Sequence, residues 1–323
     1  RPRGAYRIQG QGWSGATVHY HLRRGGQKVT LEFLDAQGAV IQTFTSDPDS
    51  TTRAAEAAKQ ARIDSLAALG VMPASARREG GEASGGFGGR FGPPQSRRVS
   101  NRAGHNQFSW NLRYPEAASF RGMILWAGGT QGPVAPPGTY TVRLTVGDQA
   151  ETRTFQVLKD PRSPATQADL EEQFQFLVQI QDRTSEANNA VRRIRNVKAQ
   201  LADRQARAGS RSGALDRLAR PFVAALSAVE GEIYQVRNES NQDPLNFPIK
   251  LNNQISALAG VVASTEAKPT AQSREVYQLL SGQLDAQLAR LRPLLDGQLG
   301  AINAELRRLN LPEIVPGTEE IGS

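Results

Sequence analysis

The chain has 323 residues, a hydrophobic content of 38% and a formal net charge of +8. This length can bury sizeable cores, so two or three domains are expected. The charge favours acidic partners. The absence of cysteine excludes disulfides and thiol chemistry. The sequence has no run of about 18 apolar residues, so no transmembrane segment is predicted. Because the chain begins at Arg1 and not at methionine, we expect a processed protein or the remainder of a longer one.

The first half of the chain alternates apolar and polar residues, as antiparallel strands with one solvated face do. Turn signals stand at residues 36–38 and 147–148. The pattern predicts about seven short strands. This number indicates that residues 1–160 form an immunoglobulin-like β-sandwich. Three of them lie between Ala5 and Thr45, and the others are Gln107–Leu112, Gly122–Trp126, Thr139–Val146 and Glu151–Val157.

Residues 46–106 form a predicted insertion in the strand pattern. Its Ala-rich part, Thr51–Leu69, is compatible with a helix that ends at Gly70 and Pro73. From Gly80 it is rich in Gly, Pro and Arg, which predicts a flexible segment unless a partner orders it. Residues 76–105 contain six arginines but only two acidic residues, Glu79 and Glu82. The insertion is therefore the place where we expect a partner-docking site, although a solvated loop is the favoured interpretation. These arginines are Arg77, Arg78, Arg90, Arg97, Arg98 and Arg102.

The second half of the chain has helical periodicity. Thr166, followed by Asp169, predicts the N-cap of a long helix. Pro221 is expected in a first turn or at a kink, and Pro293 is expected to kink or break the last helix. Residues 161–312 are therefore predicted to form an elongated antiparallel α-helical bundle, and the tail, 313–323, to fray. The predicted helices are 166–207, 215–237, one that follows Asn253 and ends near 264, and 270–310. The predicted fold class is α+β multidomain.

No catalytic, cofactor or metal site is predicted. The segment Gly10–Gly15 matches GxGxxG, but a strand pattern follows it where a nucleotide site needs a helix N-terminus. His19 and His21 lie on one strand face, about 7 Å apart, and could share a metal ion. The third histidine, His105, falls in the predicted flexible insertion, so a solvated strand face is favoured. The Arg/Gly stretch resembles RNA-binding repeats only loosely, and nucleic acid is not an expected partner.

Three stretches of the chain carry a resemblance to a known family. They are FSWNLRYPEAASFRGMILWAGGTQGPVAPPGTYTVRLTV from Phe108, VLKDPRSPATQADLEEQF from Val157 and DPLNFPIKLNN from Asp243. With them the chain resembles the C-terminal region of bacterial secreted sortilin-like proteins with neuraminidase-type repeats, often labelled glycosyl hydrolases. The resemblance implies an immunoglobulin-like domain and a helical tail that follow a large β-propeller, and it implies export to the periplasm or cell surface. The propeller and its S-x-D-x-G-x-x-W Asp-box are absent from these residues, so no catalytic residue of the family maps onto the chain.

The expected function is therefore that of a non-catalytic exported scaffold. We expect a membrane-extrinsic subunit with protein partners in a larger assembly, for example a respiratory or photosynthetic complex, and contact with anionic lipid. One alternative is the accessory C-terminal part of a secreted β-propeller hydrolase-like enzyme. Another is a carbohydrate or surface adhesion module that stacks sugars on Trp13, Trp110 or Trp126. Trp110 and Trp126 lie in strand patterns and are expected in the core.

Overall fold

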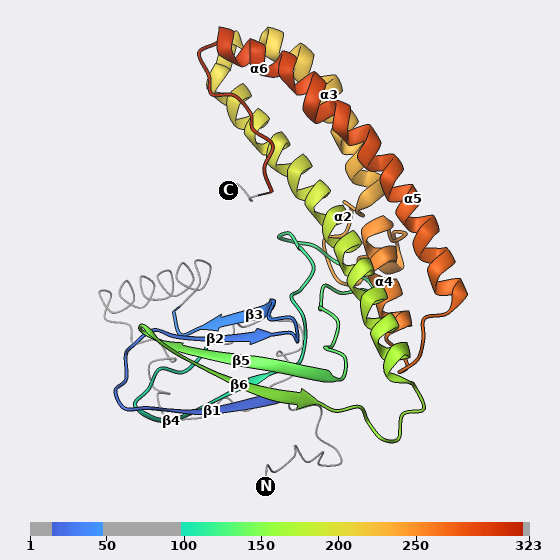
Figure 1. Ribbon diagram of the computed structural model, residues 1–323. Coiled ribbons are helices and arrows are strands. Elements are labelled where there is room, and N and C mark those ends of the chain that lie inside the picture. The colour runs from blue at the N-terminus through green and yellow to red at the C-terminus, as the bar shows by residue number, and fades with distance from the viewer. Residues whose placement is uncertain (1–14, 48–97, 319–323) are drawn as a thin grey trace, which may run out of the picture. The chain divides into compact units, whose positions relative to one another are not determined.

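The computed structural model describes residues 15–47 and 98–318 (Figure 1). The chain has mixed α and β content and divides into two compact units. Of the described residues, the strand unit contains those up to Leu112 together with Gly138–Val157, and the helical unit contains Arg113–Pro137 together with those from Leu158. The placement of residues 113–137 in the strand domain was therefore wrong. The helix predicted at 51–69 lies outside the described residues.

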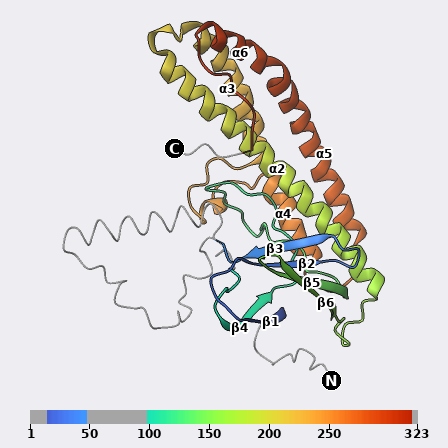
Figure 2. The same ribbon diagram turned by 60° about the vertical axis from the view of Figure 1, so that its left-hand side comes forward.

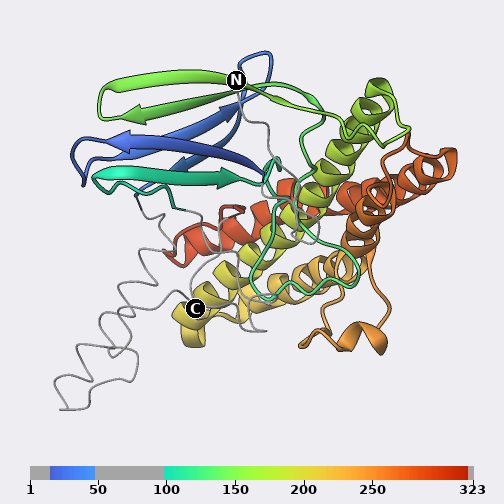
Figure 3. The same ribbon diagram turned by 90° about the horizontal axis from the view of Figure 1, so that it is seen from below.

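The strand unit consists of two antiparallel sheets. Strands β1 (Ala16–Leu22) and β4 (Gly104–Trp110) form one sheet. The other has the order β3-β2-β5-β6, from β2 (Val29–Leu34), β3 (Val40–Thr45), β5 (Gly138–Val146) and β6 (Gln149–Val157). The β5–β6 hairpin is the pair of green strands in Figure 3. The described residues thus hold six strands and not the predicted seven, because Gly122–Trp126 forms none.

Aromatic rings fill the core that the two sheets share. Alternate residues of β2 point inward, and Val29, Leu31 and Phe33 are all fully buried. Phe33 lies against Trp110 of the other sheet, with ring centroids 4.7 Å apart. Further ring contacts come from Phe44, Phe108, Tyr140 and Phe155. Aromatic and β-branched side chains suit such a half-buried strand surface, which explains why alternation located these strands.

The helical unit begins where the sequence predicts. Thr166 caps the first helix, since its hydroxyl accepts from the Asp169 N–H at 3.1 Å and its own N–H donates to the Asp169 carboxylate at 2.9 Å. The long helices lie alongside one another (Figure 2). The helices are α2 (Gln167–Ala208), α3 (Gly213–Ile233), α4 (Leu251–Val262), α5 (Ala271–Pro293) and α6 (Leu299–Arg308), with short 3₁₀ turns at Gly209–Arg211 and Asp243–Leu245.

Both prolines within the predicted helical stretches lie inside helices, with different results. α5 ends at Pro293 and continues as a π-helical turn, Leu294–Gln298, before α6. The predicted break at Pro293 is confirmed, and it matches the missing backbone donor of proline. Pro221, in contrast, lies well inside α3, so the first of its two predicted positions, a first turn, was wrong, and a kink at Pro221 stays a prediction.

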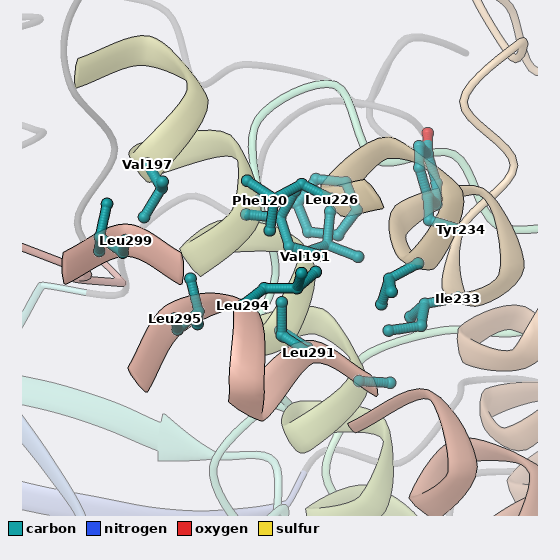
Figure 4. Packing of buried hydrophobic residues seen from close by; sticks show 14 of the residues in the cluster. Phe120, Val191, Val197, Leu226, Ile233, Tyr234, Leu291, Leu294, Leu295 and Leu299 are labelled. Carbon is teal, nitrogen blue, oxygen red and sulfur yellow. The ribbon is translucent and has the colours of Figure 1, made fainter. Parts of the chain in front are cut away.

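The apolar stripes of the helices form one core. Ile180, Val191 and Ile194 of α2 are fully buried, as are Leu226 of α3 and Leu284 of α5. Figure 4 shows how α2, α3 and the Pro293 region contribute side chains to this cluster. Each such aliphatic side chain contributes about 1.5–3 kcal/mol when it is fully removed from water.

The end of the described chain also packs on the helices. Ile314 has an exposed fraction of only 1% and belongs to the helical core. Asn303 of α6 accepts from the Ile314 N–H at 2.8 Å and donates to the Ile314 carbonyl at 3.0 Å. The prediction that the tail, 313–323, frays was therefore wrong for its described part.

Candidate functional site

The predicted docking arginines are only partly within the described residues. Arg77, Arg78, Arg90 and Arg97 lie outside them, and nothing tests their role. Arg98 and Arg102 are exposed. They lie in the segment 98–103, which leads into β4.

This segment is anchored to the strand unit, so the prediction of flexibility up to residue 106 was wrong for its last part. The N–H of buried Val99 donates to the Thr45 carbonyl at 3.3 Å. The Tyr20 hydroxyl donates to the Ser100 carbonyl. Burial raises the pKa of that hydroxyl, and this hydrogen bond partly offsets the increase. Asn106 donates to the carbonyls of Arg102 and Gly104 at 2.9 and 3.0 Å. Arg98 and Arg102 are thus carried on a fixed support.

All three histidines of the chain meet on the β1–β4 sheet, which the sequence did not predict. His105 lies in β4 and not in a flexible insertion, and the strand register places it opposite His21. His19 Nδ1 and His105 Nε2 are 3.2 Å apart and share a hydrogen bond. All three rings are exposed. Within the described ranges, no three or more His, Asp or Glu side chains are close enough together, in their present rotamers, to hold a metal ion.

In the helical unit, side chains of the helices hold the extended segment 113–137. Asn253 of α4 accepts from the Trp126 N–H and donates to the Trp126 carbonyl, both at 2.7 Å. Asn188 of α2 donates to the Ala118 carbonyl at 2.7 Å, and Asn252 donates to Asn188 at 3.0 Å. These bonds replace the ladder partners that a strand would have supplied, because buried backbone groups need partners. They explain why Gly122–Trp126 forms no strand.

The same segment inserts Phe120 into the helical core, beside a buried ionic group. The Phe120 ring meets Tyr234 edge to face at 4.9 Å, and the Arg195 guanidinium lies 4.7 Å from the Phe120 centroid. Glu230 accepts from Arg195 at 2.7 Å and from Lys198 at 2.9 Å. Burial raises the pKa of the Tyr234 hydroxyl, which accepts from the Ile124 N–H at 3.2 Å. This arrangement of charges is satisfied internally and fixes the segment.

A second group of charges lies at the end of the helical unit where α2 turns into α3. Residues 203–220 and 305–313 contain seven arginines and four carboxylates. Contacts join these stretches: Gln205 donates to Asp216 at 2.6 Å, and Arg204 donates to the Pro312 carbonyl at 3.1 Å. We call this region the basic end.

Four of these arginines are paired with carboxylates. Asp203 pairs with Arg204 and Arg207, Glu313 pairs with Arg307, and Glu305 pairs with Arg308. The remaining three, Arg211, Arg217 and Arg220, are exposed and make no direct ion pair within the described part of the chain. The helix pattern alone did not single them out, because it does not show which arginines find partners.

The tryptophans separate into different environments. Trp110 is fully buried, which confirms its prediction as a core residue. Trp126 has an exposed fraction of 43% and lies outside any strand, so its placement in the core was wrong. Trp13 lies outside the described residues. Strand β1 follows the Gly10–Gly15 motif, as the sequence pattern predicted.

One shallow hollow opens beside the start of α4. It has a volume of about 390 Å³ and is lined by Pro248–Leu251 and by side chains that include Glu232, Gln254 and Gln283. Lys250 and Glu232, on its wall, form an ion pair at 3.5 Å. The lining combines three glutamines, this ion pair and three apolar residues, an arrangement that indicates no particular reaction.

Comparison with models of protein families, with curated proteins and with solved structures finds no match for this chain. The resemblance to sortilin-like proteins thus stays a prediction. Among the described residues, no helix is long and apolar enough to cross a membrane.

Proposed function

We propose that this protein is a non-catalytic, exported docking scaffold that binds the outside of a larger membrane-associated assembly. On this proposal, the strand unit is a variant immunoglobulin-like sandwich, the helical unit is an elongated antiparallel bundle, and both are related to the C-terminal region of the sortilin-like proteins. Export to the periplasm or cell surface follows from that proposed relationship, and a respiratory or photosynthetic complex is an example of the assembly.

The basic end of the helical unit is the observation that carries this proposal. Arg217 and Arg220 are exposed on α3, and Arg211 is exposed on the short 3₁₀ turn before it. Arg217 and Arg220 act electrostatically on Glu305 and Asp216 without a direct ion pair, and their exposed guanidinium groups can also meet an acidic surface. Arginine suits such a role because its guanidinium forks match carboxylate and phosphate groups. In contrast, the buried charges and amides near Glu230 and Asn253 are engaged in holding the chain itself. Anionic lipid could supply part of the acidic surface, in addition to protein.

The test is recovery of a partner from native membranes in gentle detergent, at low and at high salt. The triple variant Arg211→Glu, Arg217→Glu, Arg220→Glu should lose the partner. The matched control is Arg193→Glu, Arg290→Glu, Arg292→Glu, which changes the net charge equally at other exposed helical positions and should retain it. High salt should weaken recovery, since about 1 M salt reduces the screening length to about 3 Å.

Two results would contradict the proposal. Equal loss with both triple variants would mean that net charge, and not the basic end, drives adsorption. Recovery of only a longer propeller-containing form of the same polypeptide would favour the accessory part of a hydrolase-like enzyme.

A carbohydrate-binding role is the second candidate, and Trp126 favours it. Its backbone is held by Asn253 at both polar groups, while 43% of the residue stays exposed. An exposed indole on a backbone that is held in this way can stack on a sugar face. Trp126→Ala should abolish retention on a glycan array if this role is real, and a wild-type chain that no glycan retains would end it.

A further inference from the structure

We propose that His19, His21 and His105 form a binding site for one late transition-metal ion on the exposed face of the β1–β4 sheet. This inference is independent of the docking proposal. It starts from the pairing of β1 with β4, which brings together residues 86 positions apart in the sequence.

The distance between two of the rings fits shared coordination. Metal–nitrogen bonds of about 2.0–2.1 Å at a tetrahedral angle place two ligand nitrogens about 3.3 Å apart. The separation of His19 Nδ1 and His105 Nε2 is 3.2 Å. The ring centroids are 5.2 Å apart and the ring planes are inclined by 22°. The separation of these two nitrogens therefore matches that of two ligands of one ion, and both rings must turn from facing each other toward the shared ion.

His21 supplies the third ligand after a change of side-chain rotamer. It is the direct cross-strand partner of His105, and such partners have Cβ atoms about 4.5–5.5 Å apart. It also lies on the same strand face as His19, two residues away. All three rings are exposed, so rotation meets little steric resistance. Three imidazoles with a water in the fourth position are an established zinc ligand set.

The proton balance of binding is simple. In the hydrogen bond between two neutral rings, one of the facing nitrogens carries a proton and the other offers a lone pair. Coordination needs a lone pair on both, so the bridging proton moves by solvent exchange to the other nitrogen of its own ring. Both rings stay neutral, and this pair releases no net proton.

The donor set selects the class of metal. Imidazole suits Zn²⁺, Ni²⁺ and Cu²⁺, whereas Mg²⁺ and Ca²⁺ require oxygen ligands. The chain has no cysteine, and these three histidines are its full complement of imidazoles. Imidazole-dependent metal binding by these 323 residues must therefore involve this sheet.

The experiment uses the full chain without an affinity tag, titrated with Zn²⁺ in a calorimeter and followed by NMR of the three imidazoles. We expect one ion per chain, with the His19 and His105 resonances shifting together. His19→Ala, His21→Ala and His105→Ala should each weaken binding at least about tenfold. Loss of a residue that only hydrogen-bonds to a metal ligand already lowers metal affinity by about 10- to 100-fold. Gln107→Ala, on the same exposed face opposite His19, is the matched control and should bind as the wild type does.

Clear results would overturn the proposal. These are no Zn²⁺ binding, a stoichiometry of two or more with independent shifts, or wild-type affinity in His105→Ala or His21→Ala. If an alanine variant lowers the unfolding temperature, the corresponding glutamine variant, such as His105→Gln, provides the same readout with a polar strand residue. Equal affinity for Mg²⁺ would also count against an imidazole site.

Discussion

The two units of this chain satisfy their extended backbone in different ways, although side chains such as Asn106 also hold the segment before β4 in the strand unit. In the strand unit, ladder pairing satisfies most backbone groups, and aromatic rings such as Phe33 and Trp110 fill the core. In the helical unit, helices cannot offer backbone groups to a neighbouring segment, because their own ladders use them. There, side chains of the helices take over that task.

Carboxamides are well suited to replace a ladder partner. An Asn or Gln side chain carries one acceptor and one donor, as a peptide group does. Three such side chains each bond both backbone groups of one residue: Asn253 with Trp126, Asn303 with Ile314, and Gln200 with Val315. The contrast with the strand unit teaches that a helical core can bind extended chain when amides stand at its surface.

The aromatic core should be the most sensitive part of the strand unit. Trp110→Ala should lower the free energy of unfolding by about 3–5 kcal/mol, since it removes a fully buried indole that contacts Phe33. Hydrogen exchange followed by mass spectrometry should show faster exchange in β2 and β4 than in the wild type. Trp126→Ala is the control, because its side chain is far more exposed, and a similar loss of stability in both variants would argue against this assignment of the core.

In the helical unit, the buried carboxylate should have the largest effect. Glu230→Gln leaves Arg195 and Lys198 without their counter-charge, and Glu230 has a side-chain exposure of 6%. Because both cations reach solvent in part, we expect a loss of about 2 kcal/mol, less than for a fully buried pair. Glu313→Gln breaks an exposed pair with Arg307 and should cost about 0.5 kcal/mol. Denaturant titrations of both variants would measure the difference.

Loss of one carboxamide should have a smaller and more local effect. Asn253→Ala leaves the Trp126 N–H and carbonyl without these partners, which should cost about 1–2 kcal/mol. Exchange should accelerate in peptides that cover residues 122–130 while α2 stays protected. Asn241, in an exposed loop, provides the control substitution to alanine. Unchanged exchange at 122–130 would show that the amide bonds do not hold this segment.

Acidification should have the smallest of these effects, a loss of stability in the helical unit. Hydrogen bonds lower the pKa of five carboxyls in the helical unit, with Thr166 acting on Asp169, Arg204 on Asp203, Ser212 on Asp216, backbone N–H groups on Asp243 and Arg308 on Glu305. A carboxyl with a lowered pKa in the folded state stabilises that state above its unfolded-state pKa, and the contribution is lost as pH falls through the folded-state pKa. The unfolding temperature of the helices, followed by their circular dichroism, should thus fall below about pH 4.

Substitution of one of these carboxyls tests that expectation. Asp216→Asn should show a smaller fall in the unfolding temperature between neutral and acidic pH, because asparagine does not titrate. A pH dependence identical to that of the wild type would mean that the hydrogen bonds of Asp216 with Ser212 and Gln205 are not coupled to folding.

Local patterns predicted the elements that local physics determines. The apolar spacing and the Thr166 cap located α2 to within a residue at each end. The run at Gly122–Trp126 was misread, because its partners are side chains such as Asn253, more than 100 residues away. His105 was separated from His19 for a similar reason, since only the register of β1 on β4 brings them together. The buried Ile314 was missed because one apolar residue in a tail gives no periodic signal.

The helical unit is assembled from two separate lengths of chain, 113–137 and the chain from 158, and this affects how the protein can be divided. A fragment that starts at Leu158 would lack Phe120 and the backbone that occupies Asn188 and Asn253. The shortest continuous stretch that encodes the whole unit must include the β5–β6 hairpin, half of the four-stranded sheet. A single cut in the gene, by truncation or by domain shuffling, therefore cannot separate the two units, although they pack as distinct bodies.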